Sequence, residues 1–340
     1  MRAVCRARLV ALVGVIALPV ASPALRAQTT VGTCSTLGVG GFNGADACAK
    51  ARDLFAFVMP QVGVALSGGN PVLGEGGTMG GWGKRAISAR VTAVDGRIPD
   101  NAVPIALTGA PQRSNFGAAR VPVPVPSVDA AIGLFAGLPA GLTNVGGVDV
   151  LLGATYLPEV NTDEFSVAPQ SSRYAFSYGV RVGALQESSL VPGLSLSFMR
   201  RKLPTTSLGY ASTNDSISVR NLAATSNSLR VVVSKRIALF GLAAGVGRDE
   251  MEHTAGVNAV VTETVGTTTT RAAVQLSDLR NTVTRSTAFV NASLGLSIAR
   301  LVGEFGWSAA GTADPTTNSF GGRAANEGYR YGSLGLTVRF

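Results

Sequence analysis

The chain has 340 residues, of which 46% are hydrophobic and only 14% are charged, and its formal net charge is +9. Beyond the N-terminal region, no stretch offers the 18 or so consecutive apolar residues of a membrane-spanning helix, which excludes the helical class of membrane protein. High apolarity without a long apolar run indicates alternation along strands. The basic residues form one cluster, Arg200-Arg201-Lys202, which we interpret as a solvated strand end, so we expect no nucleic-acid binding.

The first 27 residues have the pattern of a secretory signal peptide. Three arginines among the first eight residues precede a short apolar run at residues 9–20, and we expect cleavage after Ala27. A retained N-terminal anchor is the alternative, but the run is short for a membrane helix. The segment carries four arginines and no acid, so its removal lowers the formal charge from +9 to +5. The sequence therefore predicts an exported protein.

Residues 28–82 differ from the rest of the chain and form a separate predicted segment. Residues 45–59 place apolar side chains at helical spacing, with Asp46 near the start and Pro60 expected beyond the end. The stretch that follows is rich in glycine and has little regular pattern. We predict one helix and then a Gly-rich entry to the first strand.

Two cysteines, Cys34 and Cys48, remain once Cys5 has left with the signal peptide. An even pair, close in sequence and in an exported protein, suggests a disulfide. Metal binding is a weaker interpretation because no histidine lies near them. Two free thiols are the third alternative.

From Lys84 onward, the chain alternates apolar residues with small or polar ones in ten segments. This period of two gives each segment one apolar face and one polar face, as in an extended strand. The segments centre on residues 87–93, 130–136, 148–156, 174–182, 194–198, 229–233, 242–246, 290–298, 305–307 and 333–340.

The connections between these segments are alternately short and long. The long ones are polar and are expected to be loops. They comprise residues 98–126, 158–171, 203–226, 250–283 and 311–328.

The last segment also carries a motif. Ser333, Gly335, Val338 and Phe340 fill the pattern polar, any, Gly, any, any, apolar, any, terminal aromatic. This stretch resembles the C-terminal assembly signal of Gram-negative outer-membrane β-barrels. The resemblance implies location in the outer membrane, contact with its lipid, and recognition by periplasmic chaperones and the barrel-assembly machinery.

Short periplasmic turns and longer external loops are typical of that class of barrel. We therefore predict an all-β fold in which residues 83–340 form a transmembrane antiparallel β-barrel of about ten strands, within a range of eight to fourteen. Residues 28–82 would plug its lumen or lie at its periplasmic mouth. Asn70-Pro71 gives this segment a loose resemblance to the plug of fatty-acid transporters.

Charged residues on the polar faces of the strands are expected to line the lumen. They would tune ion selectivity, or pair with one another and with the plug. These candidates are Arg90, Asp149, Arg181, Arg230, Glu304 and Arg339.

The leading functional hypothesis is a passive channel or transporter for small solutes, hydrophobic ones included. The alternative is a non-conducting barrel with a structural or surface-binding role, which acts through its external loops. The sequence does not fix the substrate or the oligomeric state.

The sequence shows no catalytic, cofactor-binding or metal-binding arrangement. His253, the one histidine, follows a strand, and Asp249 four residues before it would lie about 13 Å away along a strand. That separation is too long for a catalytic pair, so we interpret His253 as a solvated loop residue. No Ser-His-Asp spacing or Cys/His cluster appears elsewhere. We expect a non-enzyme without a cofactor or a metal.

The cysteine pairing is testable directly. Mass spectrometry of the non-reduced protein should find the peptides of Cys34 and Cys48 joined, because a disulfide would tie the N-terminal segment together. Recovery of both cysteines alkylated without prior reduction would contradict the pairing.

Overall fold

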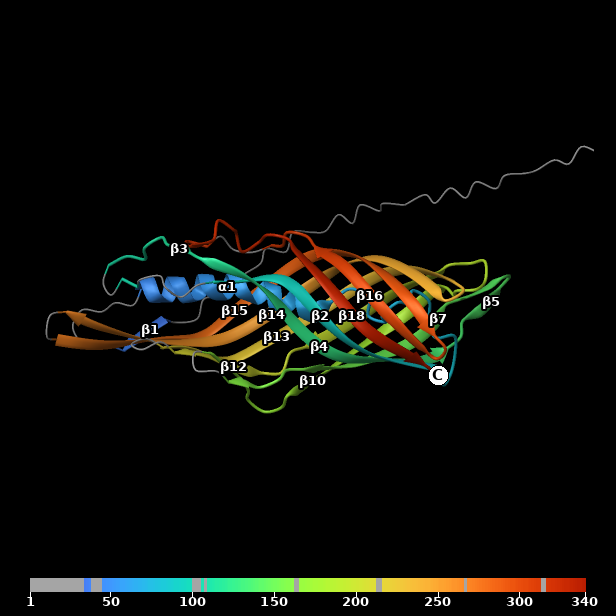
Figure 1. The fold of residues 1–340 in the computed structure, drawn as a ribbon, viewed down its shortest axis with the longest axis horizontal. Coiled ribbons are helices and arrows are strands. Elements are labelled where there is room, and N and C mark those ends of the chain that lie inside the picture. Colours follow the sequence, from blue (N-terminus) through green and yellow to red (C-terminus); the bar gives the residue numbers. More distant parts are fainter. Residues whose placement is uncertain are drawn as a thin grey trace, which may run out of the picture.

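The computed structural model describes residues 34–37, 45–99, 105–106, 109–161, 165–211, 216–265, 268–312 and 316–340. The predicted signal peptide, residues 1–27, lies outside this part of the chain. Ten long antiparallel strands pair into a closed ring (Figure 1). In ring order they are β2 (Arg85–Pro99), β4 (Ala118–Phe135), β7 (Gly147–Tyr156), β10 (Tyr174–Leu185), β11 (Gly193–Lys202), β13 (Ser216–Ile237), β14 (Phe240–Val265), β15 (Thr268–Leu296), β16 (Ala299–Ser308) and β18 (Tyr329–Arg339).

The ring closes where β18 pairs with β2, in a register that includes Leu334↔Val91 and Val338↔Ile87. Because β13, β14 and β15 pair in turn, no long strand keeps an unpaired edge along the barrel. The predicted all-β antiparallel barrel and its ten strands are confirmed. Its first strand begins at Arg85.

Side-chain burial alternates along every strand of the barrel. On β2, Ile87 and Val91 are exposed on the outside, whereas Ser88, Arg90 and Thr92 point inward and are buried. Apolar side chains thus form an exposed outer band, as in a barrel that faces lipid. The band includes Val128, Leu152, Phe176, Val180, Leu196, Phe198, Leu229, Val231, Leu242, Val246, Val290, Leu294, Leu301, Phe305, Trp307, Leu334 and Leu336.

Three strands continue well beyond this band. On β15 the outward residues change from Leu294 and Val290 to Ser286, Thr284 and Arg280, so the strand leaves the apolar band near its middle. We call residues 216–228, 248–265 and 268–286 of β13–β15 the external extension, where external denotes the end of the barrel opposite Phe340. Its sheet is widened by the short strands β1 (Cys34–Leu37), β12 (Thr206–Ala211), β9 (Phe165–Pro169) and β8 (Val160–Asn161).

Two of the predicted loops are wrong, because their residues form strands of the external extension. Residues 250–265 lie on β14, residues 268–283 lie on β15, and much of 203–226 belongs to β12 and β13. These stretches look like polar loops because their outward side chains face water instead of lipid. The period of two persists, however, with Met251, Ala255 and Val257 buried on the inner face.

A helix, α1 (Ala45–Ser67), runs within the ring of strands (Figure 1). The predicted helix, residues 45–59, is too short, and Pro60 lies inside α1 instead of beyond its end. Proline removes one hydrogen bond from a helix and disfavours it. Here α1 continues because its far half is enclosed by packing against the inner wall.

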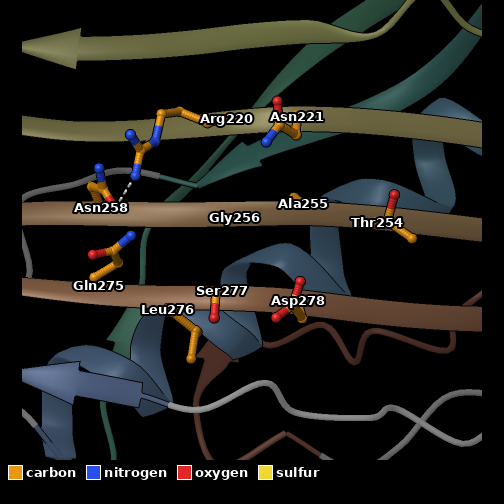
Figure 2. A pocket seen from close by; sticks show the side chains of 10 residues that line it. All are labelled: Arg220, Asn221, Thr254, Ala255, Gly256, Asn258, Gln275, Leu276, Ser277 and Asp278. Atoms are coloured by element: carbon orange, nitrogen blue, oxygen red, sulfur yellow. Dashed lines mark hydrogen bonds between the residues drawn. The ribbon is translucent and has the colours of Figure 1, made fainter.

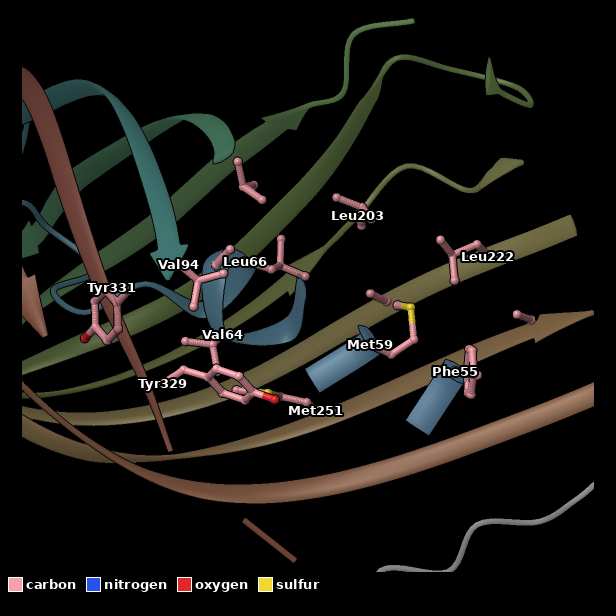
Figure 3. Packing of buried hydrophobic residues seen from close by; sticks show 14 of the residues in the cluster. Phe55, Met59, Val64, Leu66, Val94, Leu203, Leu222, Met251, Tyr329 and Tyr331 are labelled. Atoms are coloured by element: carbon pink, nitrogen blue, oxygen red, sulfur yellow. The ribbon is translucent and has the colours of Figure 1, made fainter. Parts of the chain in front are cut away.

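Apolar side chains of α1 form a core with the inner wall (Figure 3). Phe55, Met59 and Leu66 pack among wall residues such as Met251 and Leu222. Full burial of each such side chain stabilises by about 1.5–3 kcal/mol. Tertiary packing of this kind overrides the helix-breaking tendency of proline. Among the described residues, no helix has the length and apolarity needed to cross a membrane.

The two ends of the barrel differ. The short connections lie at the end that holds Phe340, including the hairpin of β5 (Leu138–Ala140) and β6 (Thr143–Val145) (Figure 1). The external extension, β1 and the start of α1 lie at the opposite end. The parallel pair of β3 (Asn115–Phe116) and β17 (Ser319–Phe320) also lies there.

Phe340 adjoins the seam of the ring. Its backbone N–H donates to the Arg85 carbonyl at 2.9 Å, and the Arg85 N–H donates to the Phe340 carbonyl at 3.2 Å. Phe240, at the start of β14, is an exposed aromatic residue at the same end but away from the seam.

We predict that Phe340→Asp blocks assembly, whereas Phe240→Asp is tolerated. A charge at the membrane–water boundary costs only about 0–1 kcal/mol in either variant, but loss of closure leaves backbone groups unpaired in lipid at several kcal/mol each. The heat-modifiable gel shift of the membrane fraction measures assembly. Normal assembly of Phe340→Asp would contradict a recognition role for this residue.

Candidate functional site

The interior of the barrel is occupied by the chain's own N-terminal part. We call α1 and residues 68–83 together the plug. Its contacts with the wall fall at three levels, beginning at the external end and finishing near Phe340. The plug therefore runs through the length of the lumen, and it lies within the ring rather than at its mouth.

At the external end, Asp53 of α1 binds the connection between β16 and β18. Its carboxylate accepts hydrogen bonds from the backbone N–H groups of Thr317 (2.8 Å) and Asn318 (2.9 Å). One turn further on, the ring of Phe57 stacks on Phe320 with centroids 4.3 Å apart. The helix thereby orders an external loop as well as filling the lumen.

Asp46, at the start of α1, binds the connection between β2 and β4 in the same way. It accepts from the backbone N–H groups of Ala106 (2.7 Å) and Gln112 (2.8 Å), and from Lys50 Nζ at 2.6 Å. Burial alone would raise the pKa of Asp46, but the hydrogen bonds from Lys50 and the two amides hold it below its usual value. A charged carboxylate thus fixes this second loop to the helix.

In the middle of the barrel, Glu304 of β16 binds the plug backbone. Its two oxygens accept from the N–H groups of Gly69 (3.1 Å) and Asn70 (2.8 Å), and also from Asn291 (2.8 Å) and Ser333 (3.0 Å) on the wall. A Cβ at Gly69 would lie 2.6 Å from the Glu304 carboxylate, so only glycine permits this approach.

Two wall arginines bind the carbonyl groups of the same turn. Arg230 donates to the carbonyls of Gly68 (3.0 Å) and Gly69 (3.2 Å), and Arg90 donates to that of Asn70 (2.8 Å). Gly68 has a φ of 57°, a left-handed conformation that favours glycine. The N–H groups of Gly69 and Asn70 and the carbonyls of residues 68–70 are therefore satisfied by charged wall residues. We call this arrangement the central clamp.

Near the Phe340 end, the plug meets a third set of charged groups. Asp149 accepts the Met79 N–H at 3.0 Å and pairs with Arg181 at 2.8 Å. Arg339 donates to the Met79 carbonyl at 3.1 Å and pairs with Glu75 of the plug at 3.2 Å. Backbone and side chains of the plug are thus held at this end as well.

All six predicted lumen residues lie on the inner side of the ring, and each contacts the plug or another wall residue. Arg339, near the end, is partly exposed, and the others are buried. They are Arg90, Asp149, Arg181, Arg230, Glu304 and Arg339.

Sequence reasoning missed further buried charges. Arg201 was interpreted as part of a solvated strand end, but it points inward, is 2% exposed and pairs with Asp129 at 2.6 Å. Asp249, which pairs with Arg230 at 2.7 Å, lies just past a predicted strand. Extension of the period of two by one or two residues would have placed all of them on the inner face.

The interpretation of His253 as a solvated loop residue is wrong. His253 lies on the inner face of β14, is fully buried and faces Gly63 of α1. It is in the external extension, beyond the apolar band, where burial and then nearby Arg285 lower its pKa to about 3. The imidazole is therefore neutral, and it belongs to the packing of the helix. Asp249 pairs with Arg230 rather than with His253.

Several wall hydroxyl groups on neighbouring strands have no hydrogen-bond partner among the described residues. Hydroxyl side chains are typical of the polar inner face of a transmembrane β-barrel. The groups without a partner belong to Thr155, Ser177, Ser195 and Ser197.

The external extension has a polar groove of about 390 Å³ on its outer face (Figure 2). Gly256 lies in its floor, with Arg220 and Asn258 joined by a 3.0 Å hydrogen bond on one side. Asn221 and Asp278 on its borders have φ values of 52° and 58° at irregularities of the strand pairing. Such strained positions often accompany binding sites.

Among the described residues, no three His, Cys, Asp or Glu side chains come together as a metal site.

Comparison with known proteins gives structural likeness only. No family model and no curated protein matches the chain. Among solved structures, the translocator domain of the autotransporter NalP from Neisseria meningitidis matches with a TM-score of 0.33 and 11% identity, over 88% of this chain and 100% of that one.

Two further solved structures match with lower TM-scores. The toluene transporter TodX of Pseudomonas putida has a TM-score of 0.21 and 7% identity, over 80% of this chain and 97% of that one. A Pseudomonas aeruginosa FadL homologue has a TM-score of 0.19 and 9% identity, over 90% and 99%. The fold is that of a transmembrane β-barrel, an assignment that rests on the closed ring and its apolar outer band.

We predict that Glu304→Gln loosens the central clamp. The neutral amide loses charge-assisted hydrogen bonds from two backbone N–H groups, and it removes a negative charge that balances the buried arginines nearby. Both effects together should lower the free energy of unfolding by about 2–4 kcal/mol. Urea unfolding of the folded protein in detergent gives this value.

The matched control is Glu252→Gln, which removes an exposed pair with Arg280 and should cost about 0–1 kcal/mol. Equal stability of the two variants would contradict the clamp.

Proposed function

We propose that this chain is an outer-membrane barrel that its own plug keeps closed, and that it acts at the cell surface through its external extension. The single observation that carries the proposal is the plug itself, bonded to the wall at the external end, in the centre and near Phe340. A solute would have to displace buried charge-assisted hydrogen bonds at each level. This arrangement favours a non-conducting barrel over the passive channel that sequence reasoning placed first.

The external parts support a role at the surface. Carboxylates of α1 fix two loops, so the helix that fills the lumen also shapes what lies outside it. The polar groove beside Gly256 offers a guanidinium, a carboxylate and amide groups, which suit a polar ligand such as a saccharide. Outer-membrane location, the signal peptide, and delivery by chaperones and the assembly machinery are part of this proposal.

A gated channel is the second candidate, and one observation favours it. The inner wall carries the hydroxyls of Thr155, Ser177, Ser195 and Ser197 beside its charged residues, and these would face the passage if the plug moved away. The charged wall residues would then line a polar pore for small solutes.

Planar-bilayer recording separates the two candidates. We expect the refolded full-length protein to give no steady conductance, because the plug fills the lumen at three levels. Glu304→Gln, which loosens the clamp, tests whether opening is possible at all. Steady channels from the unmodified protein would overturn the closed barrel and support the channel.

Labelling of intact cells tests the surface role separately. Arg280→Cys, on the external extension, should react with a membrane-impermeant maleimide, whereas Ser189→Cys, at the opposite end, should react only after permeabilisation. The unmodified protein gives the background labelling. Labelling of Ser189→Cys alone on intact cells would reverse the orientation and refute the proposal.

A further inference from the structure

A second groove lies on the outer surface of the barrel wall, where β16, β18, β2 and β4 leave the apolar band. Its volume is about 520 Å³, which is within the usual range for small-molecule sites. Ala93, Phe305 and Gly332 line its part within the band, and Asp95, Arg120 and Arg330 line its part beyond the band.

The groove therefore joins two chemical environments. Phe305 is 58% exposed and continues the lipid-facing surface of Leu334, the next outward residue after Gly332 on β18. On β2 the outward side chains change from Val91 and Ala93 to Asp95 and Arg97. An occupant of this groove must therefore place an apolar part within the band and a polar part beyond it, as a membrane lipid does.

The polar part of the groove is basic. Arg120 forms a two-pronged pair with Asp95, with Nη2 to Oδ2 at 2.6 Å, so these two charges cancel. The hydrogen bond from Arg120, together with Arg97 and Arg323 nearby, holds the pKa of Asp95 below its usual value. Arg323 is itself paired with Glu327 at 3.4 Å, so Arg97, Arg120 and Arg330 remain around the one carboxylate of Asp95, which leaves a local excess of positive charge.

Arg330 is the cation best placed for a ligand. It is exposed, it lies opposite Trp307 in the strand register, and among the described residues it forms no ion pair with an acid. Arginine binds phosphate oxygens in a forked geometry, and tryptophan is typical of the level at which lipid headgroups lie.

We propose that this groove binds a lipid with an exposed phosphate headgroup. Arg330 binds the phosphate oxygens, and an acyl chain lies along Ala93, Phe305 and Gly332. The inference rests on the transmembrane barrel and its apolar band, not on the closed state or on a role of the external extension. A free anion would leave the apolar half of the groove empty, so both halves together indicate a lipid.

The groove can be filled without disturbing the wall. A Cβ at Gly332 would have only the Glu304 carbonyl within 4 Å, at 3.5 Å, which is an ordinary contact. Gly332→Val thus places two methyl groups in the apolar half of the groove. Lys202→Ala is the matched control for Arg330→Ala. Lys202 is an exposed cation at the end of β11, on the same side of the barrel as the external extension and away from the groove.

Native mass spectrometry of the delipidated full-length protein in detergent tests the proposal with two lipids of identical chains. Dioleoyl phosphatidic acid has an exposed phosphate, whereas choline covers the phosphate of dioleoyl phosphatidylcholine. We expect the unmodified protein to retain one bound phosphatidic acid about tenfold more often than one phosphatidylcholine. In Arg330→Ala, retention of phosphatidic acid should fall by about tenfold. Lys202→Ala should bind as the unmodified protein does, and Gly332→Val should lose phosphatidic acid.

Three outcomes would overturn the lipid site. They are equal retention of the two lipids, an equal effect of Lys202→Ala and Arg330→Ala, and full displacement of phosphatidic acid by an equal concentration of inorganic phosphate. The last result would mean an anion site without chain recognition. The heat-modifiable gel shift confirms that each variant is folded, and conductance and surface labelling remain independent of this result.

Discussion

Glu304 joins the barrel wall to the chain inside it. A carboxylate on the inner face of a barrel needs either water or donors from another part of the protein, because an unpaired buried charge is strongly destabilising. Here the donors are two backbone N–H groups of the plug, and the carbonyls of the same turn accept from Arg230 and Arg90. The wall charges and the plug thus satisfy each other, and neither would be stable alone in this form.

The same principle extends outward along α1. Asp46 and Asp53 are buried acids, and each is satisfied by backbone N–H groups of an external loop. The helix therefore connects the central clamp to the loops through one rigid element. Its apolar face packs on the inner side of the external extension. This packing stabilises β13–β15 as a regular sheet beyond the apolar band.

Much of this architecture could be predicted from the sequence because lipid imposes a strict alternation. Where outward residues face lipid, as at Leu334 and Leu336, the period of two is unmistakable, and all ten strands of the ring were found there. Beyond the band the outward residues become polar, as around Glu252, and the same period looks like a loop. The buried His253 was missed for that reason.

The remaining differences come from tertiary contacts that no local pattern contains. Pro60 normally ends a helix, and only the enclosing wall explains why α1 continues to Ser67. The central clamp depends on residues separated by more than 230 positions, Gly69 and Glu304. The sequence offered the charged inner residues as candidates, but their partners appear only when the plug is placed among them.

The route of the chain also limits how the lumen could ever empty. Residue 84 is joined to β2 at the Phe340 end, while α1 begins at the opposite end. If the helix slid outward, residues 68–84 would still have to run through the ring as an extended tether. Only withdrawal toward the Phe340 end would clear the passage, and that movement would drag β1 and the start of α1 back through the barrel. The covalent path of the chain therefore prevents outward movement of the helix from emptying the lumen, independent of any hydrogen bond.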